Sequence, residues 1–140
     1  LADPVHAPIA GTDTWIYAGA GIASNAIAGR RVEAAQVQAG GDLGTWTRVV
    51  DMSPSRAGYG YTLANSMLYA FGGLNAQADD GGASARIIDP VPTLENWNNL
   101  GLSMTEPRYL MGSLTESAFI FLVGGWNGTA VTNSVEKTVW

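Results

Sequence analysis

The chain has 140 residues, of which 46% are hydrophobic, 14% are charged and 18 are glycine. This composition is too apolar for a disordered chain and sufficient for a packed core. With 12 acidic and 7 basic residues the net charge is −5, and no basic patch is available to neutralise phosphates, which argues against nucleic acid and anionic membranes as partners.

The first third of the chain predicts four short strands separated by turn-forming residues. They are expected at residues 5–10, 14–18, 32–37 and 45–50. The alanine-rich stretch 18–28 contains Gly19, Gly21 and the pair Ser24-Asn25, so we expect a glycine-rich loop there and not a helix.

The rest of the chain predicts the same kind of structure. In the middle third, strands are expected at residues 57–63, 67–71, 85–89 and 95–100, with a long Gly/Asp loop at 74–82. In the last third they are expected at 109–114, 118–123 and 134–140. Because no segment has a sustained 3.6-residue apolar period, we predict an all-β fold with antiparallel pairing and almost no helix.

An internal repeat of about fifty residues organises these strands. Its landmarks are a Gly-Gly pair after an apolar strand, an arginine and a tryptophan. The residues concerned are Gly72, Gly73, Gly124, Gly125, Arg56, Arg108, Trp46 and Trp97. The glycine pairs and the arginines recur after 52 residues, and the tryptophans after 51. A third copy of the apolar strand ends at Gly21, with Ala20 in place of the first glycine.

The order of these landmarks resembles the kelch repeat. The segment Ile87-Ile88-Asp89-Pro90 and the pair Val135-Glu136 are similar to its third-strand pattern, and residues 40–46 resemble the glycine hairpin of bacterial kelch-like propellers. The resemblance covers essentially the whole chain and departs from the family pattern at Pro4 and Ala20. It implies kelch-type β-propeller blades, each a four-stranded antiparallel sheet, in a partial ring. Blade one would span residues 1–53, blade two 54–105, and blade three 106–140 without its outer strand.

Each landmark has a structural role in this interpretation. A Gly-Gly pair permits positive φ and a close approach of neighbouring blades. Trp46 and Trp97 would be buried between blades, where each indole N–H needs an acceptor. Arg56 and Arg108 would bind backbone carbonyls or acidic groups of an adjacent blade, or alternatively line a ligand funnel.

Catalytic and metal-binding residues are scarce in this sequence. Cysteine is absent and His6 is the single histidine, which leaves no material for a thiolate metal site or a histidine cluster. The run Asp79-Asp80-Gly81-Gly82 could be read as a calcium loop, but it lacks the alternating ligand spacing of a dedicated site. We therefore expect no enzyme activity, no cofactor and no metal in this chain.

The expected function is a non-catalytic protein-interaction or scaffold domain of a longer extracytoplasmic protein. Recognition is assigned to the loops at 19–30 and 74–84 and to the turn that begins at Trp126. The candidate residues are Asn25, Asn75, Asp79, Asp80, Trp126 and Asn127. Asn127-Gly128-Thr129 is also an N-glycosylation sequon.

The partner would be another protein, the remaining blades of the same propeller, or a glycan, with no direct insertion into a membrane. Low charge and a single lysine favour an extracellular, cell-surface or periplasmic location. Alternatively, the chain belongs to a carbohydrate-binding or sugar-processing kelch enzyme whose active residues lie in other blades. Another alternative is that two copies assemble into a six-bladed ring.

Overall fold

The computed structural model describes residues 7–22, 28–75, 77–88 and 91–140, and these residues form three antiparallel sheets. The first sheet contains β1 (Ile9–Gly11), β2 (Trp15–Ala18), β3 (Glu33–Gln36) and β4 (Thr47–Arg48). The second contains β5 (Gly60–Ala64), β6 (Met67–Asn75), β7 (Gln77–Arg86) and β8 (Asn98–Ser103). The third contains β9 (Gly112–Glu116), β10 (Phe119–Val123) and β11 (Val135–Val139).

The described residues contain no helix, so the prediction of an all-β, antiparallel fold is confirmed. Within each sheet the strands follow one another in chain order, as expected when short turns join consecutive strands. For example, Asn65 and Ser66 both have positive φ, as a two-residue turn between β5 and β6 requires.

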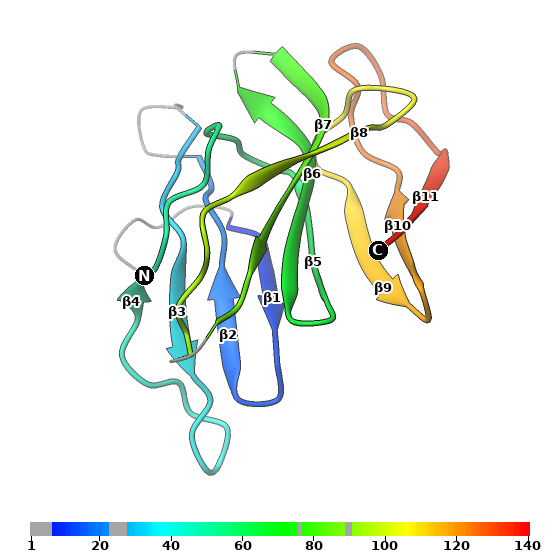
Figure 1. Ribbon diagram of the computed structural model, residues 1–140. Coiled ribbons are helices and arrows are strands. Elements are labelled where there is room, and N and C mark those ends of the chain that lie inside the picture. The colour runs from blue at the N-terminus through cyan, green and yellow to red at the C-terminus, as the bar shows by residue number, and fades with distance from the viewer. Residues whose placement is uncertain (1–6, 23–27, 76, 89–90) are drawn as a thin grey trace.

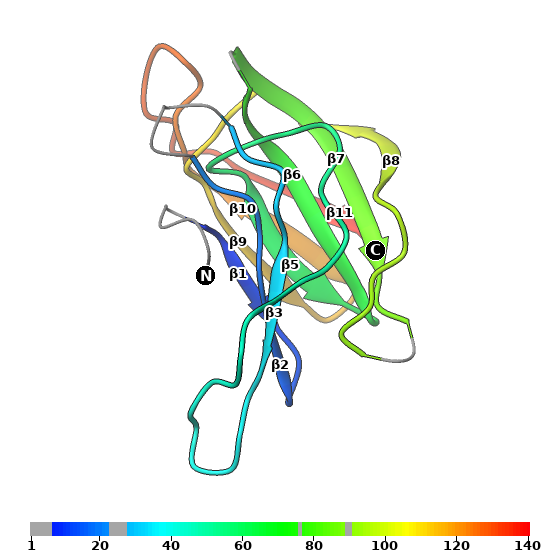
Figure 2. The ribbon, with the colours of Figure 1, turned by 90° about the vertical axis from the view of Figure 1, so that its left-hand side faces the viewer.

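The three sheets are arranged side by side and meet along their first strands. Strand β5 contacts both β1 and β9, so the three first strands are neighbours in space (Figure 1). The later strands of each sheet fan away from this line (Figure 2). The chain therefore builds a stack of sheets in which the second has a neighbour on each face.

The second sheet corrects the expected loop at residues 74–84. Strand β6 continues through Asn75 and pairs with β7, with Gly73 opposite Asp79 and Leu74 opposite Ala78. A register shift between Phe71 and Gly73 marks a β-bulge. The bulge lets the strand pair bend and continue, so the Gly- and Asp-rich segment forms a hairpin instead of a long loop. The third strand of this sheet therefore spans Gln77–Arg86, whereas it was expected at residues 85–89.

Two apolar cores separate the sheets. The core between the first and second sheets contains Tyr17, Val32, Met52, Tyr59, Tyr61, Leu68, Leu94 and Trp97, together with small alanines. The core between the second and third sheets contains Tyr69, Phe71, Met104, Met111, Ile120 and Leu122. Burial raises the pKa of Tyr17 to about 12, and burial also raises the pKa values of Tyr59 and Tyr61. All three phenols therefore stay neutral at physiological pH.

The two repeat tryptophans have different environments. Trp97 is 8% exposed and packs against Tyr61 at a ring-centroid distance of 6.4 Å. Trp46 is only half-buried, which corrects the expectation that both are buried between sheets. Trp97 reaches into the core shared with the preceding sheet, and the described residues contain no sheet that precedes the first one. The Nε1 of Trp97 has no acceptor among the described residues, contrary to the expectation of one.

Candidate functional site

The two Gly-Gly pairs share one backbone conformation, in the bulge within β6 and directly after β10. Gly72 and Gly73 have φ of +62° and +104°, and Gly124 and Gly125 have +64° and +107°. Both pairs therefore adopt the same left-handed backbone, which strongly favours glycine. A Cβ on Gly72 would lie 2.5 Å from the carbonyl oxygen of Arg108, so the absence of a side chain also allows the second and third sheets to approach.

Arg108 is 1% exposed, and its guanidinium binds residues at the end of β10 and at the start of β11. Its Nη1 donates to the carbonyl of Gly124 at 3.3 Å and to Oγ of Ser134 at 2.7 Å. Its Nη2 donates to a carboxylate oxygen of Glu136 at 2.5 Å, and the carboxylate of Glu106 lies 3.7 Å away. The buried guanidinium is thus compensated by carbonyl, hydroxyl and carboxylate oxygens, as a buried charge requires.

Arg56 makes the corresponding contacts in the second sheet. Its Nη1 donates to the carbonyls of Gly72 and Gly81, each at 3.0 Å. As expected, both arginines donate to backbone carbonyls and Arg108 also to a carboxylate, but these partners belong to the arginine's own repeat and not to an adjacent blade. The reason is geometric, because each arginine lies four residues before the first strand of its sheet and its side chain reaches the first glycine of the Gly-Gly pair in the same sheet. Their burial assigns these two arginines to the scaffold, and neither guanidinium is accessible to a ligand.

A groove of about 500 Å³ lies between the tip of the β6–β7 hairpin and the turn of the third sheet. It is lined by Leu74, Ala78, Pro107, Tyr109, Asn127, Gly128 and Thr129. The hairpin and the turn project from the same end of the structure (Figures 1 and 2). The groove therefore brings together two of the three segments to which recognition was assigned, although they are about fifty residues apart.

Asn127 shapes the wall of this groove. Its side-chain oxygen accepts the backbone N–H groups of Thr129 at 2.9 Å and Ala130 at 2.8 Å, and its amide donates to Glu106 at 2.5 Å. Trp126, which is half-buried, exchanges two backbone hydrogen bonds with Tyr109. Both residues are thus held in place by their neighbours, so the turn is a preformed surface.

The other candidate residues divide into two groups. Asn75 is exposed at the end of β6, and Asp79 and Asp80 lie in β7 next to the groove-lining Ala78. Asn25 and His6 lie outside the described residues. Within the described part of the chain no group of three or more His, Cys, Asp or Glu side chains could hold a metal ion, and no helix there is long and apolar enough to cross a membrane.

The sequence did not point to Pro107 and Tyr109 as lining residues. They flank the repeat landmark Arg108. This position could have indicated them, because the neighbours of a buried arginine are held in a fixed place. Chemically, the groove offers an aromatic ring, aliphatic carbons and backbone amides on a rigid frame. Such a surface can bind a polypeptide segment or a loop. The described lining residues include no carboxylate, histidine or cysteine side chain.

Comparison with known proteins shows a similarity to a repeat protein. No protein-family model matches the chain. Over 84 residues, which are 60% of this chain, it is 32% identical to beta-scruin of Limulus polyphemus, a kelch-repeat protein. The matched segment is only 9% of the length of beta-scruin. Together with the repeated antiparallel sheets and their Gly-Gly pairs at equivalent positions, this similarity indicates a kelch-like repeat.

Proposed function

We propose that this chain is a non-catalytic protein-interaction or scaffold domain built of β-propeller blades. The observation that carries the proposal is the groove between the β6–β7 hairpin and the turn at Asn127, a concave surface on a rigid frame. The similarity of the chain to a segment of beta-scruin supports a kelch-type scaffold. Low charge and a single lysine favour an extracytoplasmic setting.

The outer faces of the stack support the propeller. Phe71 in the second sheet is 3% exposed, whereas Val123, at the same position of the third sheet, is 43% exposed. On the other side, Tyr61 is 4% exposed and its counterpart Ile9 in the first sheet is 65% exposed. These two outer residues are apolar and exposed, whereas their counterparts in the middle sheet are covered, which is expected if a further sheet packs on each outer face.

The isolated 140-residue chain should therefore associate in solution. Exposed apolar faces on both outer sheets favour packing against another copy, at about 25 cal/mol per Å² of apolar surface removed from water. Light scattering coupled to size-exclusion chromatography should show species larger than one chain, with the proportion rising with concentration. A stable, folded monomer at every concentration would contradict the propeller and require a self-contained fold.

Partner binding at the groove can be tested by site-specific photocrosslinking in the full-length protein. A benzophenone amino acid at Thr129, which lines the groove, should give discrete protein adducts in extracts of the source organism. The control position is Ser117, an exposed residue in the β9–β10 turn away from the groove. Adducts shared by both positions, or none at Thr129, would contradict a partner site here, and glycan adducts would favour the carbohydrate-binding alternative.

A further inference from the structure

The turn that forms one wall of the groove contains Asn127-Gly128, the one Asn-Gly pair of the sequence. In such a pair the backbone nitrogen of the glycine can attack the side-chain amide of the asparagine, because glycine has no Cβ to hinder the approach. Asn127 is half-buried and Gly128 is exposed. A Cβ added to Gly128 would meet no atom beyond its chain neighbours within 4 Å, so the pair is open to solvent.

The hydrogen bonds of Asn127 hold its side-chain amide in a reactive arrangement. Its Oδ1 accepts the backbone N–H groups of Thr129 at 2.9 Å and Ala130 at 2.8 Å. The bond from Thr129 closes a ring that contains the nitrogen of Gly128, so the side chain is folded back toward this nitrogen. Among the described residues none accepts a hydrogen bond from the Gly128 N–H. Two N–H groups on one carbonyl oxygen also stabilise negative charge that develops there.

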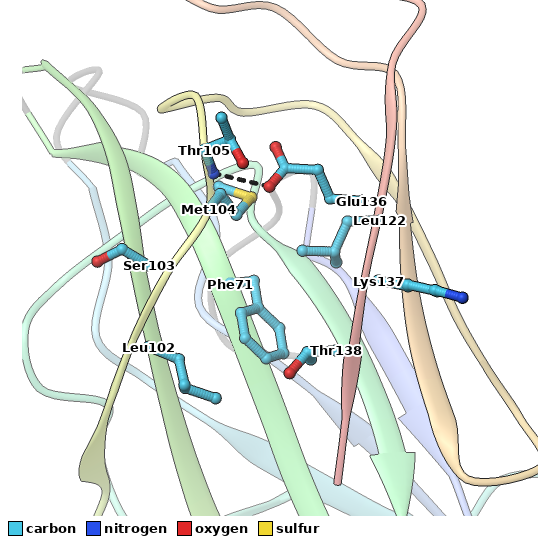
Figure 3. Close-up of a pocket in the computed structure, with 9 residues that line it drawn as sticks. All are labelled: Phe71, Leu102, Ser103, Met104, Thr105, Leu122, Glu136, Lys137 and Thr138. Carbon is cyan, nitrogen blue, oxygen red and sulfur yellow. Dashed lines mark hydrogen bonds between the residues drawn. The ribbon is translucent and has the colours of Figure 1, made fainter.

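Glu106 fixes the other side of this amide, because its carboxylate accepts a hydrogen bond from Nδ2 of Asn127 at 2.5 Å. Glu106 is itself held in place, since Nε of Arg108 donates to its carbonyl at 3.3 Å. The preceding Thr105 donates its backbone N–H to the carboxylate of Glu136 at 2.7 Å, in a pocket beside β11 (Figure 3). The amide of Asn127 therefore keeps one orientation, with its oxygen toward the backbone of the turn and its nitrogen toward a carboxylate.

We propose that Asn127 is a site of spontaneous deamidation and that the product opens the wall of the groove. The nitrogen of Gly128 loses its proton to solvent and forms a bond with Cγ of Asn127. In the resulting tetrahedral intermediate, the N–H groups of Thr129 and Ala130 hold the negative charge on Oδ1. The Cγ–Nδ2 bond then breaks, Nδ2 leaves as ammonia with a proton from water, and a succinimide remains. Water opens this ring at either carbonyl carbon and gives aspartate or isoaspartate.

The product removes a hydrogen-bond donor from the turn and adds a negative charge. An aspartate at this position has no N–H to donate to Glu106, so two carboxylates face each other where a hydrogen bond had been. Like charges at this distance repel each other. Because Asn127, Gly128 and Thr129 line the groove, the reaction displaces one of its walls. An effect on partner binding rests on the proposed function, whereas the modification itself does not.

Asn99 provides a matched control within the same chain. Its side-chain oxygen also accepts the backbone N–H two residues further on, that of Gly101 at 2.7 Å. It is followed by Leu100, whose side chain hinders the approach of the backbone nitrogen. Among the described residues, its oxygen has no second N–H donor and its amide no carboxylate acceptor. Asn99 thus shares the turn geometry but lacks the features that favour reaction at Asn127.

The reaction is tested by incubating the 140-residue chain at neutral pH and physiological temperature and following its peptides by mass spectrometry. Asn127 should be converted to aspartate and isoaspartate at least about tenfold faster than Asn99, which lacks the second N–H donor at its carbonyl oxygen. Enzymatic methylation of isoaspartate gives an independent measure. Equal rates at the two asparagines would overturn the proposal.

A synthetic peptide with the sequence of residues 123–133 separates the contribution of the fold from that of the dipeptide. Asn127 should react at least as fast in the folded chain as in this peptide, because the fold already provides both N–H donors. A slower reaction in the folded chain would show that the turn protects the amide, and the proposal would then be wrong.

Asn127→Asp tests the effect of the product on the groove. Hydrogen–deuterium exchange of residues 126–130 should become about tenfold faster, as expected for like charges near a protein surface. Glu106→Gln in the same chain should reverse this increase, because its amide can donate to the new carboxylate, and Asn99→Asp should leave exchange at 126–130 unchanged. No increase, or one that Glu106→Gln does not reverse, would contradict the opening of the wall. None of these measurements uses a partner, so their failure is distinguishable from failure of the proposed function.

Discussion

Replacing Trp97 with alanine should lower the free energy of unfolding by about 3–5 kcal/mol, as truncation of a large buried aromatic residue does. The indole lies in the core between the first and second sheets and packs against Tyr61. Its loss would leave a cavity that these neighbours fill only in part, because they are fixed in their strands. Urea unfolding followed by circular dichroism measures the change.

Trp46→Ala is the matched control, because Trp46 holds the same place in the first repeat but is half-buried. It should destabilise the isolated chain clearly less than Trp97→Ala. An equal decrease in the free energy of unfolding for both variants would mean that the two tryptophans are equally buried in solution, for example through association of the first sheet with another copy.

Arg108→Ala should lower the free energy of unfolding by about 3 kcal/mol or more, since removing one partner of a buried ion pair leaves the other partner uncompensated. The change removes the hydrogen bonds to Gly124, Ser134 and Glu136 in a single step. Among the described residues, the carboxylate of Glu136 would then keep the hydrogen bond from the backbone N–H of Thr105. The same unfolding measurement applies.

Arg48→Ala serves as the control for this experiment. Arg48 also pairs with a carboxylate, that of Asp51, but its side chain is exposed, and exposed ion pairs contribute little to stability. The double variant Arg108→Met with Glu136→Leu should recover part of the loss because no buried charge remains unpaired. If the double variant were as unstable as Arg108→Ala, the hydrogen bonds to Gly124 and Ser134 would account for the whole effect.

The sequence alone determined the all-β fold, the period of the repeat and the positive φ of the glycine pairs Gly72-Gly73 and Gly124-Gly125. These features depend on local chemistry: strand pattern, turn residues and the tolerance of glycine for positive φ. The arginine and tryptophan landmarks were also found in this way, because they recur at a constant spacing. Their burial and their partners did not follow from that spacing.

Only the tertiary structure decided how these residues are used. The segment that begins at Leu74 became a hairpin because a β-bulge beside Gly73 let two strands continue pairing, and composition does not show a bulge. Trp97 is buried and Trp46 half-buried because burial depends on which sheet lies opposite. The groove and the pocket beside β11 likewise form between residues far apart in the chain. Contacts of this kind depend on packing between sheets, which a one-dimensional pattern does not contain.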